Sequence, residues 1–214
     1  MKTTIPTIYT RGEEIANSLT HGLGLVLSVA GLAVLVTFAA LRDDAWTVIG
    51  CAVFGASLVL LYGASTCYHL LRPPRWKSAL RVADHAAIFL LIAGSYTPFL
   101  LVSLRGPWGW SLFGVVWAIA VAGIVLKLFY TGRFRLLSTI LYLFMGWIVL
   151  IAVKPLVQAL PRSSVILLFA GGAAYSAGTL FYMWKRLPYH HAVWHLFVLG
   201  GSAAQFIAVA CYVI

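Results

Sequence analysis

Seven long apolar runs follow one another along the chain, and short polar connections separate them. Each run can cross a bilayer as a helix, because a span needs about 20 apolar residues. The connections contain the Arg, Lys, Pro and Gly residues that interrupt such helices, as in "RPPRWK" at 72–77. The predicted spans are 15–41, 46–71, 82–104, 108–130, 135–158, 162–184 and 191–213. The pattern predicts an all-α integral membrane protein, a seven-transmembrane helix bundle in which residues 1–214 form a single domain.

The composition agrees with a membrane protein and excludes an ordinary soluble domain. The chain is 62% hydrophobic and 9% charged, whereas soluble domains are about half apolar and a quarter charged. We expect no cleavable signal peptide, since Glu13 and Glu14 precede the first apolar run and no small-residue cleavage site follows a short one. We expect no disulfide framework, because three cysteines lie separately within apolar runs.

The net charge of +10 comes from basic residues in the connections, so we expect no nucleic-acid partner. Lys and Arg are instead distributed unequally between the two ends of the spans. Eleven lie at one end and four at the other, which places the N-terminus in the cytoplasm and the C-terminus outside. The eleven are Lys2, Arg11, Arg72, Arg75, Lys77, Arg81, Lys127, Arg133, Arg135, Lys185 and Arg186; the four are Arg42, Arg105, Lys154 and Arg162.

Polar residues from four spans fall at one depth near the predicted cytoplasmic face. His21 lies in the early turns of the first span, His69 in the last turn of the second, and Asp84 in the first turn of the third. His191 and His195 open the seventh span. Ionisable groups within a membrane are costly and usually functional. Their shared depth therefore predicts a functional site.

Helical spacing indicates what kind of site this is. His191 and His195 are four residues apart and share one helix face, so two imidazoles there can bind one metal ion. Ser65 lies one turn deeper than His69 on the same face. Three histidines with one open position are the pattern of a catalytic Zn²⁺ site. Asp84 can hold the water or orient a ligand.

The first span adds a polar stripe, since Glu14, Asn17 and His21 project in similar directions from a helix. This stripe is a candidate for lining the same cavity. The alternative is that it forms only the wet, capped start of a helix.

Simpler interpretations remain open for the other residues. A histidine pair at a helix start can be an interfacial pair, and Ser65 can bond the carbonyl one turn before it. Asp84 can pair with Arg81. A Ser65–His69–Asp84 triad is disfavoured, because it gives no role to the histidines of the seventh span.

Four stretches of the chain resemble the bacterial hemolysin III family, which is related to the progestin and adipoQ receptors and more distantly to the alkaline ceramidases. They are "EEIANSLTHGLG" at 13–24, "STCYH" at 65–69, "DHAAIFLLIAGSYTPF" at 84–99 and "HAVWH" at 191–195. The combination of S-x3-H, an Asp opening the third span and H-x3-H opening the seventh is specific. The resemblance extends over essentially the whole chain.

The resemblance implies a multi-pass protein of the bacterial plasma membrane with a zinc ion near the cytoplasmic face. Carried over by motif, the metal ligands are His69, His191 and His195, Asp84 binds the zinc water and Ser65 supports the site. The related families imply hydrolysis of lipid amide bonds, with a membrane lipid as substrate or ligand and a role in membrane lipid homeostasis. The chain lacks the long N-terminal domain of the animal receptors, so we do not expect signalling through such a domain.

Two other functions stay open at this point. One is a non-enzymatic, receptor-like membrane sensor in which zinc is structural. The other is a pore-forming cytolysin, which the family name suggests. The confinement of polar residues mainly to one face of the membrane disfavours a water-filled conduit.

Overall fold

The computed structural model describes residues 9–214, apart from the side chains of Pro74 and Arg75. Lys2 and the side chain of Arg75, both used in the charge count, lie outside this description. No strand occurs within residues 9–214. In chain order the helices are α1 (Arg11–Ala40), α2 (Ala45–Leu70), α3 (Pro74–Pro98), the π-helix η1 (Phe99–Ser103), α4 (Pro107–Tyr130), α5 (Arg135–Trp147), the 3-10 helix η2 (Ile148–Ala152), α6 (Val153–Ala159), α7 (Arg162–Met183) and α8 (His190–Tyr212).

Within residues 9–214, seven helical segments are long and apolar enough to cross a membrane, so the predicted fold class is confirmed. The third span runs from Trp76 to Ser103 and joins α3 to η1. It begins earlier than residue 82 because Pro74 occupies the first helical position, where its missing N–H costs no hydrogen bond. The fifth span joins α5, η2 and α6 from Arg135 to Ala159.

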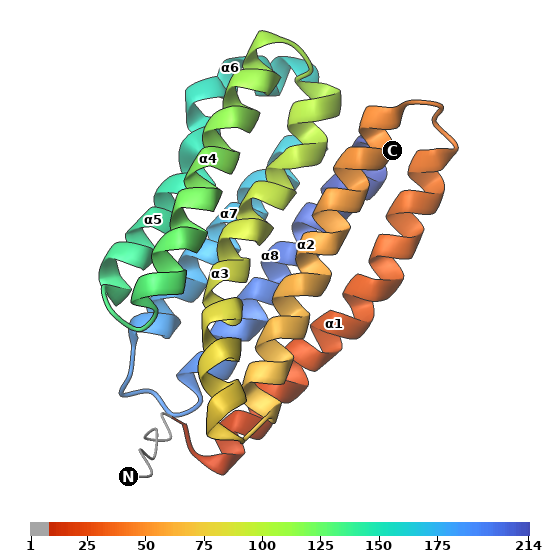
Figure 1. Cartoon of the computed structure of the whole chain (residues 1–214). Coiled ribbons are helices and arrows are strands. Elements are labelled where there is room, and N and C mark those ends of the chain that lie inside the picture. The colour runs from red at the N-terminus through yellow and green to blue at the C-terminus, as the bar shows by residue number, and fades with distance from the viewer. Residues whose placement is uncertain (1–8) are drawn as a thin grey trace.

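The helices pack side by side in one elongated bundle (Figure 1). α1 packs on α2, α2 on α3, α3 on α4 and α7 on α8, and α8 also contacts α1. The two termini lie at opposite ends of the bundle, which seven crossings require (Figure 1). We call the end that holds Tyr9 the N-terminal end. That it faces the cytoplasm stays a prediction.

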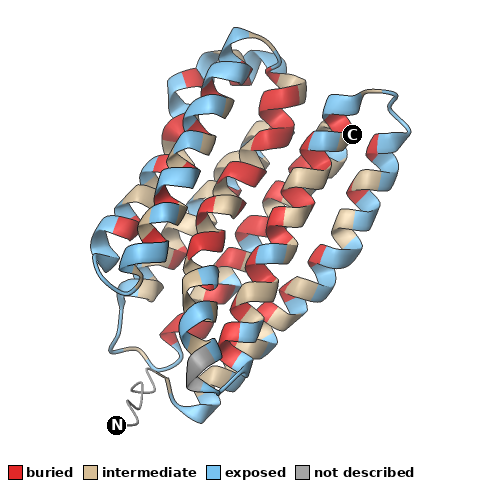
Figure 2. Ribbon diagram, viewed as in Figure 1, coloured by how far each residue is buried: buried red, intermediate tan, exposed pale blue. Residues whose placement is uncertain are grey.

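The third span is the most enclosed of the seven. In its most apolar stretch of 18 residues, 67% of the residues are buried, whereas the value for α1 is 22%. Figure 2 shows buried residues mainly along the inward faces of the helices, with exposed residues along α1. The exposed side chains of α1 are largely apolar, as the lipid-facing surface of a span requires. Close helix contact uses small residues: a Cβ on Gly123 of α4 would lie 2.3 Å from Cζ of Phe89 on α3.

Candidate metal centre

The ends of α2 and α8 bring three histidines together at the N-terminal end of the bundle. His69 lies next to the last residue of α2, and His191 and His195 lie in the first turns of α8. Tyr189 has a left-handed backbone conformation (φ 56°), which redirects the chain immediately before α8 begins. The depth of the two α8 histidines is therefore set by where that helix starts.

One ligand atom from each of His69, His191 and His195 lies within 4.8 Å of the other two. All three side chains are buried, with exposed fractions of 3%, 6% and 1%. Imidazole nitrogens converging at this spacing can hold a metal ion. The trio combines residues that are 126 positions apart in the sequence (195 minus 69).

Hydrogen bonds fix which nitrogen of two histidines is available. Nδ1 of His69 lies 2.6 Å from Oε2 of Glu14, and an ionised carboxylate can only accept. Nδ1 of His195 lies 3.3 Å from the Asn17 carbonyl oxygen, which also only accepts. In this arrangement both Nδ1 atoms carry the proton, so both Nε2 atoms keep a lone pair for a ligand.

Unpartnered nitrogens support the fit to a metal. Nε2 of His69 and Nδ1 of His191 are buried and have no hydrogen-bond partner among the described residues. Buried polar atoms without partners are rare and call for an explanation such as an ion or a water. Three imidazoles that can each offer a nitrogen suit a divalent transition metal, so the residues fit the zinc that the sequence predicts.

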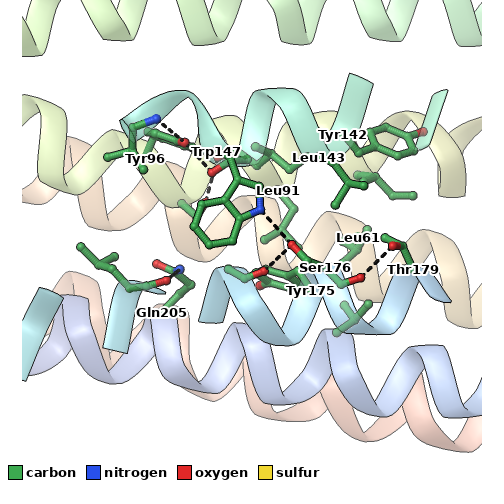
Figure 3. A pocket seen from close by; sticks show the side chains of 18 of the residues that line it. Leu61, Leu91, Tyr96, Tyr142, Leu143, Trp147, Tyr175, Ser176, Thr179 and Gln205 are labelled. Atoms are coloured by element: carbon green, nitrogen blue, oxygen red, sulfur yellow. Dashed lines mark hydrogen bonds between the residues drawn. The ribbon is translucent and has the colours of Figure 1, made fainter. Parts of the chain in front are cut away.

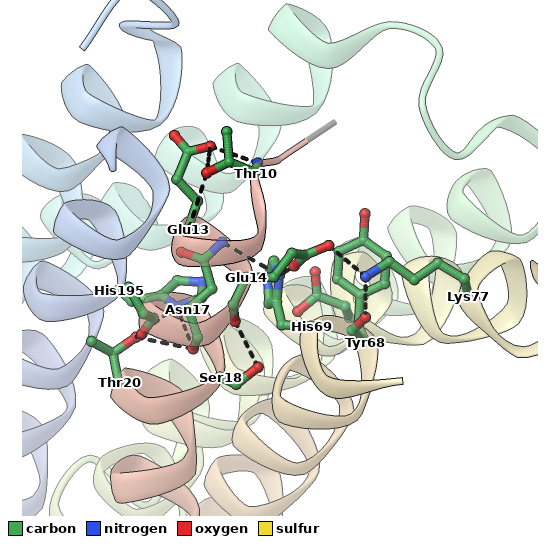
Figure 4. Close-up of polar contacts among 12 residues, drawn as sticks. Thr10, Glu13, Glu14, Asn17, Ser18, Thr20, Tyr68, His69, Lys77 and His195 are labelled. Carbon is green, nitrogen blue, oxygen red and sulfur yellow. Dashed lines mark hydrogen bonds and ion pairs between the residues drawn. The ribbon is translucent and has the colours of Figure 1, made fainter. Parts of the chain in front are cut away.

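The polar stripe of α1 lies against the trio (Figure 4). Besides His69, Glu14 contacts Lys77, whose Nζ donates to Oε1 at 2.6 Å. Nδ2 of Asn17 lies 3.4 Å from Nδ1 of His69. The His21 ring stacks on that of His195, with centroids 3.4 Å apart and an interplanar angle of 13°. Thus α1 contributes residues that orient two of the three histidines.

A mainly apolar cavity of about 160 Å³ lies within the bundle (Figure 3). His21, His191, His195 and Asp84 line it, together with Leu, Ile, Phe and Trp side chains. Gln205, Ser176 and Ser95 supply polar groups in its wall. Of the predicted stripe, His21 lines the cavity, whereas Glu14 and Asn17 contact His69 instead.

Asp84 and Ser65 take different positions. Asp84 is 8% exposed and lines the cavity, with Oδ2 3.5 Å from Nδ1 of His85. No ion pair joins it to Arg81 in the described part of the chain. Ser65 is fully buried, and its Oγ has no described hydrogen-bond partner. The bond to its own helix that the simpler interpretation offered is therefore absent from the described contacts.

Sequence patterns missed several residues that surround the trio. Tyr9 lies over it, with ring centroids 5.0 Å from His191 and 5.7 Å from His69. Burial raises the pKa of Tyr9, so its hydroxyl stays neutral. Thr20 contacts Nδ1 of His195 at 3.1 Å. One sequence signal nearby is the capping box of Thr10 and Glu13. This motif marks where α1 starts, and the start of the helix determines where Glu14 lies.

The fold and the trio together define a seven-helix membrane protein with a histidine cluster that can hold a metal near one end of the bundle. The chain belongs to the family described as "Haemolysin-III related", which matches residues 9–206. It is therefore a multi-pass protein of the bacterial plasma membrane.

Individual relatives support this membership. The chain is 51% identical to "Hemolysin-3 homolog" of Bacillus subtilis (strain 168), over 96% of each chain. It is 47% identical to "Hemolysin-3" of Bacillus cereus, over 94% of this chain and 92% of that protein. Human "Monocyte to macrophage differentiation factor" is 30% identical, over 97% of this chain and 86% of its own length. No solved structure matched the chain.

Proposed function

We propose that the protein is a zinc-dependent hydrolase that acts on a membrane lipid, with a lipid amide as the substrate class. One observation carries the proposal: His191 and His195 of the trio line an apolar cavity whose wall also contains the carboxylate of Asp84. Such a cavity suits an acyl chain, and a carboxylate beside a metal-binding cluster is the usual arrangement for hydrolysis.

His69, His191 and His195 would hold the ion, and Glu14 and Asn17 would orient two of these ligands. When bound, zinc supplies Lewis-acid chemistry that acidifies water and polarises a carbonyl. In this proposal Asp84 accepts a proton from the attacking water and returns one to the leaving nitrogen. The amide C–N bond breaks, a C–O bond forms, and the products are a carboxylic acid and an amine.

Ser65 takes a supporting role in this proposal. Its Oγ is buried without a described partner, one helical turn from His69. A hydroxyl there can donate to negative charge that develops on the substrate oxygen.

A receptor-like sensor with structural zinc is the second candidate. The trio joins α2 to α8. Glu14 contacts His69 of α2, and the Asn17 carbonyl contacts His195 of α8, so both helices are also connected to α1. A metal at this position would clamp three helices. A pore-forming cytolysin has less support, since the cavity is lined mainly by apolar side chains.

The metal content of purified protein in mild detergent, prepared without chelator, tests the first step. We expect about one zinc per chain in the wild type and its loss in the His191→Ala/His195→Ala variant. His190→Ala is the matched control, because His190 neighbours His191 but is outside the trio. Wild-type protein without metal would contradict the proposal.

Lipid turnover tests the second step. We expect the purified protein to release fatty acid from a labelled ceramide, and Asp84→Asn to lower the rate about 10²–10⁴-fold while metal is retained. Equal turnover by wild type and variant would remove Asp84 from the mechanism. Absence of any turnover, with a Tm that falls when metal is removed, would favour the sensor. Ion flux through reconstituted vesicles would favour the pore.

A further inference from the structure

Four basic side chains lie on segments that meet at the N-terminal end of the bundle. They come from α3, the end of α4, the start of α5 and the α7–α8 connection, segments that lie at the same end in Figure 1. We call them the basic cluster: Arg81, Lys127, Arg135 and Lys185.

Lys127 is the central member, since it is buried and only 3% exposed. Its Nζ donates to Oγ of Ser138 at 2.5 Å and lies 5.8 Å from the ring centroid of Tyr142. Ser138 in turn donates to the Phe134 carbonyl, so the hydroxyl is an acceptor for the lysine. A buried ammonium with only neutral partners is costly unless an anion joins it.

Of the other three members, Arg81 interacts with Lys127 and Arg135 interacts with Lys185. The guanidinium of Arg81 covers the α4–α5 turn, where a Cβ on Gly132 would lie 2.8 Å from Nη2, and its charge interacts with that of Lys127. Nζ of Lys185 lies 4.5 Å from the ring centroid of Tyr182, and burial and the charge of Arg135 lower the pKa of Lys185 to about 8. Tyr182 lies within reach of the charges of Arg135, Asp84 and Arg81.

In the part of the chain that the structure describes, no carboxylate lies within ion-pair distance of these four side chains, although the charge of Asp84 acts on Tyr142 and Tyr182 beside them. The chain has five acidic residues, of which Asp43 and Asp44 lie in the α1–α2 connection at the other end of the bundle. Glu13 bonds Thr10 and the Tyr189 N–H, and Glu14 bonds His69 and Lys77. Asp84 has His85 as its described ion-pair partner. Within residues 9–214, no ion pair involves a member of the basic cluster.

We propose that the basic cluster is a binding site for a dianionic phosphate group, either the phosphomonoester headgroup of a lipid or free inorganic phosphate. Arg provides a planar fork that matches phosphate oxygens, and Lys provides a point charge, so the combination suits a dianionic phosphate. Tyr142 and Tyr182 contact the cluster and also line the cavity. The site therefore lies beside the cavity, where it can hold a headgroup while acyl chains stay among the apolar helices.

The proposal does not depend on hydrolysis, and binding tests it directly. We would measure saturable binding of a fluorescent short-chain phosphatidic acid to the full chain in mild detergent. Lys127→Met keeps the length of the side chain and removes its charge, and we expect it to weaken binding at least about tenfold, as loss of a charged contact does. Lys185→Gln changes an exposed connection and should also weaken binding without affecting folding.

Arg133→Gln is the matched control. Arg133 is exposed in the same α4–α5 turn but contacts no member of the cluster in any described interaction. Binding should change less than about twofold, because screened surface charges contribute little. Equal losses in Lys127→Met and Arg133→Gln would reduce the effect to general attraction at the membrane surface and overturn the proposal. Absence of saturable binding in the wild type would also overturn it.

Competition identifies the source of the phosphate. Displacement of the lipid by millimolar inorganic phosphate, lost in Lys127→Met, would indicate a site that accepts free phosphate. Retention of the lipid against inorganic phosphate, together with the Lys127→Met loss, would indicate a lipid headgroup site. Either result supports phosphate recognition by the basic cluster.

Discussion

Nδ1 of His69 on α2 lies 2.6 Å from Oε2 of Glu14 on α1. The carboxylate can hold the proton of the imidazole on Nδ1, and Nε2, which has no described partner, is then available to a metal ion. We expect Glu14→Gln to weaken metal affinity about 10–100-fold, since loss of such an orienting partner has this effect. Competition with a chelator of known affinity measures the change.

Glu13→Gln is the control for this experiment. Glu13 is the neighbouring acid and caps α1 through Thr10, and glutamine also satisfies a capping box. Its metal affinity should equal that of the wild type. If both variants bind metal like the wild type, Glu14 does not orient His69.

Tyr9 covers the histidine trio from the N-terminal end, with ring centroids 5.0 to 5.9 Å from His69, His190 and His191. We expect this half-buried ring to limit the access of water and chelator to the site. We expect Tyr9→Ala to lose metal to excess chelator several times faster, while Tyr9→Phe behaves like the wild type. The rate of metal release measures this, and identical rates in wild type and Tyr9→Ala would show that the ring does not shield the site.

Two glycines of α4 should respond in opposite directions to alanine. A Cβ on Gly123 would lie 2.3 Å from Phe89, so Gly123→Ala should destabilise the protein by about 1–3 kcal/mol through overpacking. Gly114 has no atom within 4 Å of its Cβ position, so Gly114→Ala should stabilise the helix by about 0.5–1 kcal/mol. Thermal unfolding in mild detergent compares the two, and equal Tm shifts would contradict the close α3–α4 contact.

Lys185 should make the stability of the protein depend on pH. Its pKa in the fold is about 8, below its ordinary value of 10.5, because burial and Arg135 disfavour the charged amine. Between these values the unfolded chain binds more protons, so the free energy of unfolding rises as the pH increases from about 8. Because the side chain is partly exposed, we discount the gain to about 1 kcal/mol or less, or about 2–4 °C in Tm.

The comparison of Lys185→Met with the wild type between pH 7 and pH 10 measures this effect. The variant should have the higher Tm at pH 7 and should lack the rise that the wild type shows. Lys154→Met, at the other end of the bundle, should keep the rise. A rise of equal size in Lys185→Met would assign it to other groups.

The sequence by itself determined the seven spans and the depth of the candidate site. Apolar length decides whether a helix crosses the membrane, and the start or end of a span fixes the depth of residues such as His69, Asp84 and His191. The four-residue spacing of His191 and His195 also followed from helical periodicity alone.

Only the tertiary structure decided which side chains meet. It set Glu14 against His69, Tyr9 over the trio, Asp84 in the cavity wall and the buried Lys127 against Ser138. Periodicity gives the rise and angle of residues within one helix. The rotation of each helix about its own axis, and the order of its neighbours, depend on side-chain packing between segments far apart in the sequence.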